Sequence, residues 1–158
     1  MGDKKEKKVL VYNSEAPIEE QVVSLLKGLK KTITTAESIT GGMISAAITS
    51  VEGASECFKV GYVSYSNKAK RKLLSVKKEL LRKEGAVSSS VAKEMAIGAM
   101  MESEADLAVA VTGNAGPTAL EDKELGLVYI AGCAGGKTKV EEYHFTGTRK
   151  EIREQCCN

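Results

Sequence analysis

Ser38 stands three residues before two consecutive glycines, at a point where the sequence predicts that a strand gives way to a helix. Thr40, Gly41 and Gly42 follow it in the stretch TTAESITGGMIS. Glycine weakens the interior of strands and helices, but it lets a ligand approach the backbone closely, and free amides at a helix start attract anions. A serine hydroxyl placed here could act as a nucleophile, with nearby amides receiving the oxyanion that develops on a carbonyl substrate.

A second glycine-rich bend, TGNAGP at 112–117, follows the apolar stretch DLAVAV. In open α/β sheets, ligands bind where strands pass into loops and into the first turns of helices. Neither bend has the spacing of a Walker loop or a GxGxxG fingerprint, so the sequence does not indicate a nucleoside triphosphate or a dinucleotide. Each pattern on its own is also compatible with an ordinary turn.

A serine nucleophile needs a base, and the sequence offers histidine or lysine. The single histidine, His144, stands in an expected strand, which indicates a structural or surface role and argues against a Ser-His-Asp triad. A lysine acts as a base only when it is neutral, which requires burial or neighbouring positive charge. The basic segment 67–78 offers both, with Lys70 one turn before Leu74. Composition and spacing do not select Lys70 over the other lysines of this segment.

The hydrophobic pattern predicts alternating strands and helices that would position these groups. We expect strands over 9–13, 32–36, 57–66, 106–113, 126–133 and 137–145. We expect helices over 17–31, 43–51, 67–78, 87–105 and 147–155. The last two strands are joined by AGGK, which is typical of a hairpin turn. This order predicts an α/β fold, a three-layer α/β/α sandwich with a mixed, mostly parallel sheet.

Length and composition indicate one globular domain. The chain has 158 residues, of which 42% are hydrophobic and 28% charged, as in folded rather than disordered proteins. Residues 1–8 are expected to form a flexible charged arm, followed by a single domain over 9–158. The formal net charge is +2, which is too balanced to indicate nucleic-acid binding. The basic runs near the N-terminus and at 67–78 are interpreted as a solubilising tail and a solvated helix face.

No targeting or membrane segment is apparent in the sequence. No apolar run approaches the roughly eighteen residues of a membrane helix, and the apolar stretch near the N-terminus is too short for a signal peptide. We therefore expect a cytoplasmic protein. The four cysteines form no CxxC pair and there is no histidine cluster, so we expect reduced thiols and no metal or cofactor.

Five stretches of the chain occur in the order and spacing of a known family: TTAESITGG, GYVSYSNKAKRKLL, GAVSSSVAKEMAIGAM, ADLAVAVTGNAGP and GLVYIA. From about Thr34 to Arg153 the chain resembles the CinA C-terminal domain family, which includes stand-alone nicotinamide-mononucleotide deamidases (PncC type). The resemblance implies hydrolysis of the carboxamide of nicotinamide mononucleotide to the nicotinate nucleotide and ammonia, without a metal or cofactor.

The resemblance also assigns catalytic roles, because Ser38, Tyr65 and Lys70 stand where the family has its motif serine, tyrosine and lysine. It implies that Ser38 attacks the amide carbon while Lys70, as a neutral amine, takes the hydroxyl proton. Tyr65 would relay or position that proton. The amides near 40–42 are the expected oxyanion site, so that Thr40, Gly41 and Gly42 would contact the substrate.

The nucleotide's phosphate and polar groups need partners of their own. We expect them in the second glycine-rich bend, at the start of the basic helix and in the last helix: Thr112, Gly113, Ala115, Gly116, Ser66, Asn67, Arg149 and Arg153. Asn67 fits equally well as the N-cap of the basic helix. Glu37 fits either a role in orienting Lys70 or the ribose, or a structural or surface role.

Four features differ from the family pattern or from the family's longer members. TALEDKELG at 118–126 replaces the usual glycine-rich loop with Pro-Val-Gly, and Asn114 takes a usually apolar place. The chain ends at EIREQCCN, before the long closing helix of relatives, which affects the expected roles of Arg149 and Arg153. Only about thirty residues precede the match, so we expect no N-terminal molybdopterin-binding-like domain and no pyrophosphatase activity.

Three functional hypotheses follow. The first is an amidohydrolase that acts on nicotinamide mononucleotide in pyridine nucleotide recycling. The second is a non-catalytic nucleotide-binding or interaction domain of the same fold, which the altered 118–126 loop favours and the intact serine, tyrosine and lysine set opposes. The third is hydrolysis of another amide or nucleotide. The expected partner is a small-molecule nucleotide substrate, with no nucleic acid and no membrane, and formation of a homo-oligomer is left open.

Overall fold

A computed structural model describes residues 13–158, which fold around one five-stranded sheet with the strand order β2-β1-β3-β4-β5. The strands are β1 (Ile33–Glu37), β2 (Phe58–Val63), β3 (Leu107–Gly113), β4 (Leu127–Ala134) and β5 (Lys137–His144). Each agrees with an expected strand to within a few residues at its ends. The charged arm, and all but the last residue of the strand expected over 9–13, lie outside the described residues.

The sheet is mixed, as predicted. β1 pairs in parallel with β2 and with β3, whereas β4 is antiparallel to both β3 and β5. Four of the five strands therefore run in the same direction, and only β4 opposes them. β4 and β5 are joined by the tight turn that the sequence predicts at AGGK, and both of its glycines have positive φ angles.

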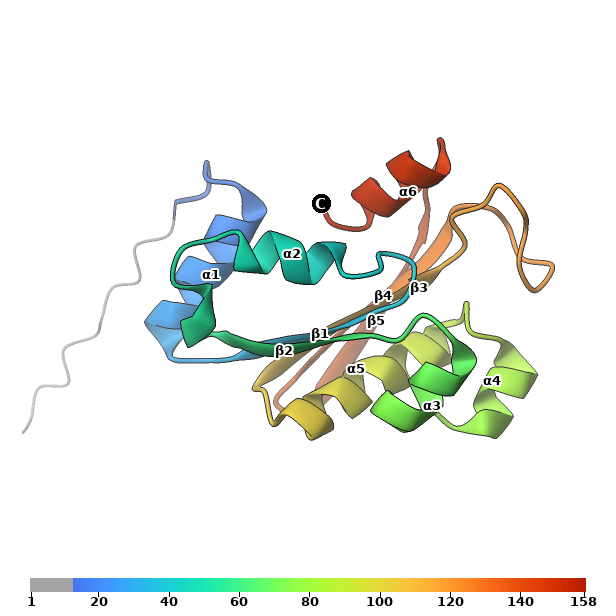
Figure 1. The fold of residues 1–158 in the computed structure, drawn as a ribbon, viewed down its shortest axis with the longest axis horizontal. Coiled ribbons are helices and arrows are strands. Elements are labelled where there is room, and N and C mark those ends of the chain that lie inside the picture. The colour runs from blue at the N-terminus through green and yellow to red at the C-terminus, as the bar shows by residue number, and fades with distance from the viewer. Residues whose placement is uncertain (1–12) are drawn as a thin grey trace, which may run out of the picture.

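Within the described residues, six α-helices cover the two faces of this sheet (Figure 1). They are α1 (Ile18–Leu29), α2 (Met43–Thr49), α3 (Asn67–Leu74), α4 (Lys78–Glu84), α5 (Ser89–Ser103) and α6 (Arg149–Gln155), with a short 3-10 turn at Ala54–Glu56. Helices α1, α2 and α6 lie on one face, and α3, α4 and α5 on the other. The chain is therefore a three-layer α/β/α sandwich, as predicted. Within residues 13–158, no helix is long and apolar enough to span a membrane.

Small side chains bring α5 close to the centre of the sheet. Its inward face and the strands beneath it contribute fully buried residues, mostly alanines: Val91, Ala92, Met95, Ala96, Ala99, Ala36, Ala108, Ala110 and Ala131. On the opposite face, Val23 and Leu26 of α1 pack with Ile33, while Ile152 of α6 packs with Val111. Burial of these apolar groups is the main contribution to the stability of the three layers.

The basic segment differs from the prediction, because 67–78 contains the whole of α3, a break at residues 75–77 and only the first residue of α4. Ser75 adopts a left-handed conformation with φ 56°, and the amide of Val76 donates back to the carbonyl of Lys70. Leu74 and Val76 are both buried, and a spacing of two residues does not fit one face of a helix. Burial of Val76 therefore ends α3, and α4 begins at Lys78.

The expected cap of α3 is also wrong by one residue. Ser66 has extended backbone angles, and its hydroxyl accepts a hydrogen bond from the amide of Ala69 at 3.0 Å. Asn67 is the first residue of the helix, not its cap. Serine and asparagine cap helices about equally well, so the sequence alone did not distinguish two such neighbours.

Candidate active site

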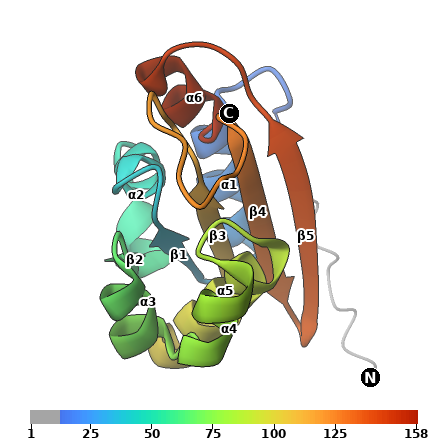
Figure 2. The ribbon, with the colours of Figure 1, turned by 90° about the vertical axis from the view of Figure 1, so that its right-hand side faces the viewer.

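A cavity of about 550 Å³ opens at the carboxyl ends of β1 and β3. Figure 2 shows this edge of the sheet, with the loop after β3 lying between α6 and the pair α3 and α4. The cavity brings together nine residues that were predicted from the sequence: Ser38, Tyr65, Asn67, Lys70, Thr112, Gly113, Ala115, Gly116 and Arg149. Segments distant in the sequence therefore meet at one site.

Ser38 is held firmly at the end of β1. Its amide donates to the carbonyl of Val111 on β3 at 3.0 Å, and its own carbonyl accepts from the amide of Gly41 at 3.1 Å. The residue is 9% exposed and lines the cavity. The bend that carries the hydroxyl is thus fixed by backbone hydrogen bonds on both sides.

Glu37 stabilises this bend from within the protein. Its fully buried carboxylate accepts hydrogen bonds from the Thr40 hydroxyl, the amides of Ile44 and Ser45, and the Ser45 hydroxyl, at 2.6–2.9 Å. An internal carboxylate thus occupies the amides at the start of α2 that could have attracted an anionic ligand. Of the roles considered for Glu37, the structure supports the structural one.

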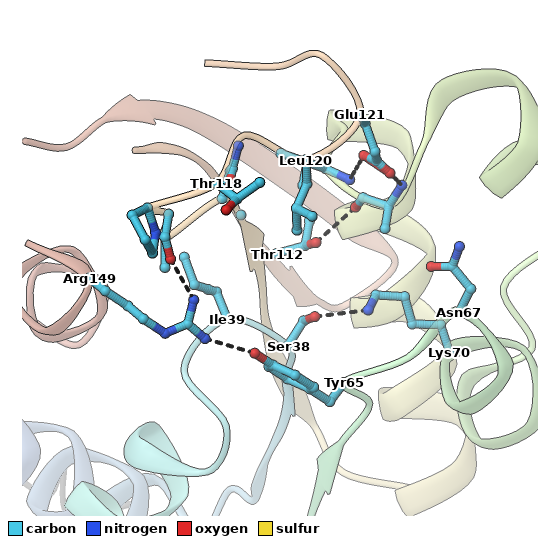
Figure 3. A pocket seen from close by; sticks show the side chains of 17 residues that line it. Ser38, Ile39, Tyr65, Asn67, Lys70, Thr112, Thr118, Leu120, Glu121 and Arg149 are labelled. Carbon is cyan, nitrogen blue, oxygen red and sulfur yellow. Dashed lines mark hydrogen bonds between the residues drawn. The ribbon is translucent and has the colours of Figure 1, made fainter. Parts of the chain in front are cut away.

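Lys70 is the most consequential residue of the cavity, because its ammonium group contacts the candidate nucleophile. Its Nζ lies 2.8 Å from Ser38 Oγ and 2.8 Å from the carbonyl oxygen of Ser64, and the residue is only 1% exposed (Figure 3). It points inward on the same face of α3 as Leu74, whereas its basic neighbours on this helix are exposed. The structure thus selects one lysine where the local sequence pattern did not.

Burial changes the acid–base behaviour of this lysine. Removal from water lowers the pKa of Lys70 from 10.5 to about 8, and the nearby carboxylate of Glu121 partly opposes that effect. A minor but significant fraction of the amine is then neutral near pH 7, and most of it is neutral above pH 8. In that form, the contact with Ser38 lets the hydroxyl donate its proton to the amine.

Tyr65 lies at the mouth of the cavity and does not contact the serine–lysine pair through its hydroxyl. The side chain is 61% exposed, and its hydroxyl accepts a hydrogen bond from Arg149 Nη2 at 2.9 Å (Figure 3). Arg149 Nη1 donates to the carbonyl of Gly116 at 2.8 Å. Among the described residues, no hydrogen bond joins Tyr65 to Ser38 or Lys70, so the arginine, rather than the lysine, fixes the tyrosine.

Five expected contact residues lie outside the cavity lining. Thr40 is buried and bonded to Glu37, and Gly41 and Gly42 form the turn into α2, with φ angles of 56° and 110°. Ser66 is occupied as the cap of α3. Arg153 donates to the carbonyls of residues 39 and 40, at 3.0 and 3.3 Å, and so braces the Ser38 bend from α6. In this structure, these five residues support the segments that form the site, but they do not line the cavity.

The second glycine-rich bend forms one wall of the cavity. The Thr112 hydroxyl donates to the carbonyl of Ala86, which ties β3 to the turn before α5. Gly113 has no room for a side chain between Ile39 and Val128. Within residues 13–158, the amides of Ala115 and Gly116 have no hydrogen-bond acceptor, so both are free to bind a ligand in the cavity they line.

Several lining residues were not predicted, and most belong to two segments: Ile39, Ala86, Val87, Asn114, Pro117, Thr118, Leu120 and Glu121. Glu121 accepts hydrogen bonds from the amides of Ala86 and Val87 at 2.7 and 3.0 Å, so it fastens the 118–126 loop to the turn between α4 and α5. Asn114 donates to two carbonyls of the same loop, those of Lys123 and Glu124. The sequence signals for these contacts were the unusual composition of the loop and the presence of Asn114 at a place that is usually apolar in the family.

Among the described residues, the cysteines are free and no group of three metal-ligating side chains could hold an ion. Burial raises the pKa of Cys156 to about 12, so this thiol is a poor nucleophile near neutral pH. His144 is half exposed on β5 and pairs with Glu124 and Glu142, away from the cavity. The serine–lysine pair is therefore the candidate nucleophile and base of the cavity.

The fold and the site define an α/β domain with a serine–lysine pair at the carboxyl edge of its sheet. The family model of the CinA C-terminal domain matches residues 15–158, and the chain belongs to this family. It is 49% identical over 135 residues to a CinA-like protein of Endomicrobium trichonymphae, with 85% of this chain and 32% of that protein covered. It is 46% identical over 140 residues to a CinA-like protein of Kosmotoga olearia, with coverage of 88% and 34%. The chain thus spans about a third of the length of these relatives.

Solved structures confirm the fold. The chain superposes with a TM-score of 0.88 on a competence-damaged protein (CinA) superfamily protein from Escherichia coli, at 31% identity, covering 99% of this chain and 93% of that one. It superposes with a TM-score of 0.85 on the competence/damage inducible protein CihA from Agrobacterium tumefaciens, at 38% identity, covering 94% and 93%. The resemblance inferred from the motifs is therefore confirmed at the level of family and architecture.

Proposed function

We propose that this domain hydrolyses the carboxamide of nicotinamide mononucleotide to nicotinate mononucleotide and ammonia, and so recycles pyridine nucleotides. The observation that carries the proposal is the 2.8 Å contact between Ser38 Oγ and a buried lysine amine, in a cavity large enough for a nucleotide. The choice of substrate rests on the family resemblance of the motifs that hold this pair.

In the first half of the reaction, neutral Lys70 accepts the Ser38 proton as the serine oxygen attacks the carboxamide carbon. A carbon–oxygen bond forms and the carbonyl oxygen becomes an oxyanion. The amide carbon–nitrogen bond then breaks, and the nitrogen leaves as ammonia with the proton that Lys70 had taken. The product of this half is an ester between the nicotinoyl group and the serine.

In the second half, water attacks the ester, and neutral Lys70 takes a proton from this water as it had from the serine. The carbon–oxygen bond to Ser38 breaks, the proton returns to the serine oxygen, and the nicotinate nucleotide is released. The carbonyl of Ser64 supports both halves, because its hydrogen bond holds the amine beside the serine. The same base therefore serves acylation and deacylation.

The oxyanion is expected to accept hydrogen bonds from free backbone amides. In such sites, each donor stabilises the transition state by about 3–4 kcal/mol. The sequence placed this role near 40–42, but the Gly41 amide already donates to the carbonyl of Ser38, and residues 40–42 do not line the cavity. The free amides of Ala115 and Gly116 are the better candidates in the cavity. Arg149 is the cation available at its mouth for the nucleotide's phosphate.

The experiment is an assay of ammonia release from nicotinamide mononucleotide by the purified protein, beside a panel of other nucleotides and amides. We expect ammonia release by the wild type and loss of at least about a thousandfold in Lys70→Ala and Lys70→Arg, because guanidinium does not lose its proton at working pH. Lys83→Ala, an exposed lysine outside the cavity, is the control and should keep full activity. Turnover of another substrate alone would overturn the choice of substrate but not the serine–lysine mechanism.

A second candidate function is nucleotide binding without catalysis. It is favoured by the 118–126 loop, which departs from the family pattern and places Leu120 and Glu121 in the cavity wall. Calorimetry with nicotinamide mononucleotide separates the two: binding without any ammonia release supports the second candidate. The intact contact between Ser38 and Lys70 favours catalysis, since a binding site has no need of a buried amine with a lowered pKa.

A further inference from the structure

A second hollow lies between α3 and α4, outside the candidate active site. It has a volume of about 390 Å³ and is lined by Asn67, Lys68, Arg71, Lys72, Lys78, Leu81 and Arg82. Five of these seven residues are cationic and none is acidic. The two helices lie side by side in both views of the fold (Figures 1 and 2), so one face of each contributes cations to the same groove.

These five cations have no acidic partners in the described part of the chain. All five are exposed, and none forms an ion pair. Elsewhere lysines are commonly paired, as with Lys27 and Glu56, Lys31 and Asp106, or Lys77 and Glu94. The groove therefore concentrates uncompensated positive charge on a chain whose formal net charge is only +2.

Helix stability does not account for this arrangement. Cations favour the last turn of a helix, which suits Arg71, Lys72 and Arg82, but they are unfavourable in the first turn. Lys68 is the second residue of α3 and Lys78 the first residue of α4. Each also stands four residues before another cation of the groove, a spacing at which like charges repel. An anion in the groove would remove this repulsion.

We propose that the groove between α3 and α4 binds a small phosphate-bearing anion, such as pyrophosphate or a phosphate ester. Phosphate oxygens accept several charge-assisted hydrogen bonds at once from arginine and lysine, which matches a hollow with five such donors. The hollow is a compact pocket confined to two short helices rather than an extended basic surface, which favours a small ligand over a nucleic acid.

The groove lies next to the candidate active site, because Asn67 lines both hollows. The phosphate group bound in the groove could therefore come from either of two kinds of ligand. It can belong to a separate anion, or to a ligand whose other end occupies the cavity, such as a dinucleotide. The proposal itself concerns the phosphate and does not require that the domain be an amidase.

The test is calorimetric titration of the wild-type chain with inorganic pyrophosphate at low ionic strength. Arg71→Gln/Arg82→Gln should weaken binding by about tenfold or more, since charged hydrogen bonds contribute most of the affinity. The matched control is Lys83→Gln/Lys93→Gln, which removes the same net charge from exposed residues of α4 and α5 outside the groove. The control should bind pyrophosphate as the wild type does. Ammonia release, measured in parallel, reports separately on the proposed amidase.

Two further sets of binding measurements identify the source of the phosphate. If one ligand spans the two hollows, both the groove variant and Arg149→Gln should bind nicotinamide adenine dinucleotide more weakly than the wild type does. If the ligand is a separate anion, pyrophosphate affinity should be unchanged by Arg149→Gln and by saturating nicotinamide mononucleotide. The proposal is overturned if pyrophosphate does not bind, if the control loses as much affinity as the groove variant, or if only a single-stranded oligonucleotide binds in a groove-dependent way.

Discussion

In the proposed mechanism, two side chains carry out the chemistry, those of Ser38 and Lys70. The serine is fixed at the end of β1, and the lysine is placed against it by burial on the inner face of α3. The family motif predicted both, and the contact at 2.8 Å gives them a physical relation that the sequence alone did not provide. The tyrosine of the motif is instead held by Arg149, 84 residues further along the chain, a contact that local pattern does not encode.

The first prediction concerns the pH dependence of ammonia release. Because burial lowers the pKa of Lys70 to about 8, kcat/KM should rise with pH and level off above that value as the amine becomes neutral. The measurement is kcat/KM for nicotinamide mononucleotide across a pH series, with a midpoint expected near pH 8. A midpoint near the ordinary lysine value of 10.5 would show that burial does not tune this amine.

The second prediction concerns stability. The pKa of Lys70 is about 8 in the folded chain and near 10.5 when unfolded, so below pH 8 the protein must bury a charged amine. As pH rises from about 8 to about 10.5 the unfolded state holds more protons, and the wild type should gain about 3 kcal/mol relative to Lys70→Met. Urea unfolding of both proteins across this range measures the difference. A constant difference would mean that the amine is not buried.

Several contacts in the loops and helices around Ser38 and Lys70 depend on residues that are far apart in the sequence. The 118–126 loop is fastened by Glu121 to amides 34 and 35 residues earlier, and Lys123 donates to the carbonyls of Glu84 and Val87 in the same region. In the sequence these are ordinary acidic and basic loop residues, so their position at the cavity could not be predicted. The break between α3 and α4 was missed for a related reason, because it depends on the burial of Val76 in the core.

The third prediction belongs to this loop. The Glu121 carboxylate favours the charged form of Lys70, so Glu121→Gln should lower the pKa of the lysine further. The midpoint of the pH–activity profile should then move to lower pH. Asp122→Asn is the matched control, since this neighbouring acid is exposed and does not line the cavity, and it should leave the midpoint in place. An unchanged or raised midpoint in Glu121→Gln would contradict the assigned effect of the carboxylate.

Over the whole molecule, the three layers bring Lys70 of α3 against Ser38, which directly follows β1 at the carboxyl edge of the sheet. This architecture was predictable, because the alternation of strands and helices, the apolar β3 stretch and the final hairpin are all encoded locally. How closely α5 packs beneath α3 was not predictable. Gly98 of α5 faces the end of α3 so closely that a β-carbon there would overlap the carbonyl of Leu74.

The fourth prediction tests this close contact. Gly98→Ala should lower the free energy of unfolding by about 1 to 3 kcal/mol, because α3 must shift to admit the methyl group. The measurement is chemical denaturation monitored by circular dichroism. Gly132→Ala is the control, since a β-carbon at that exposed strand position meets no atom within 4 Å, and it should change stability little. Equal stability of the two variants would mean that the helices are not so closely packed.

The claim on which the proposed chemistry depends is that the Ser38 hydroxyl attacks the carboxamide. The most direct test is the rate of ammonia release from saturating nicotinamide mononucleotide by Ser38→Ala, with Ser50→Ala, at the exposed end of α2, as the control. We expect kcat to fall by about a thousandfold or more in Ser38→Ala and to remain at the wild-type value in the control. Wild-type turnover by a correctly folded Ser38→Ala protein would contradict the mechanism.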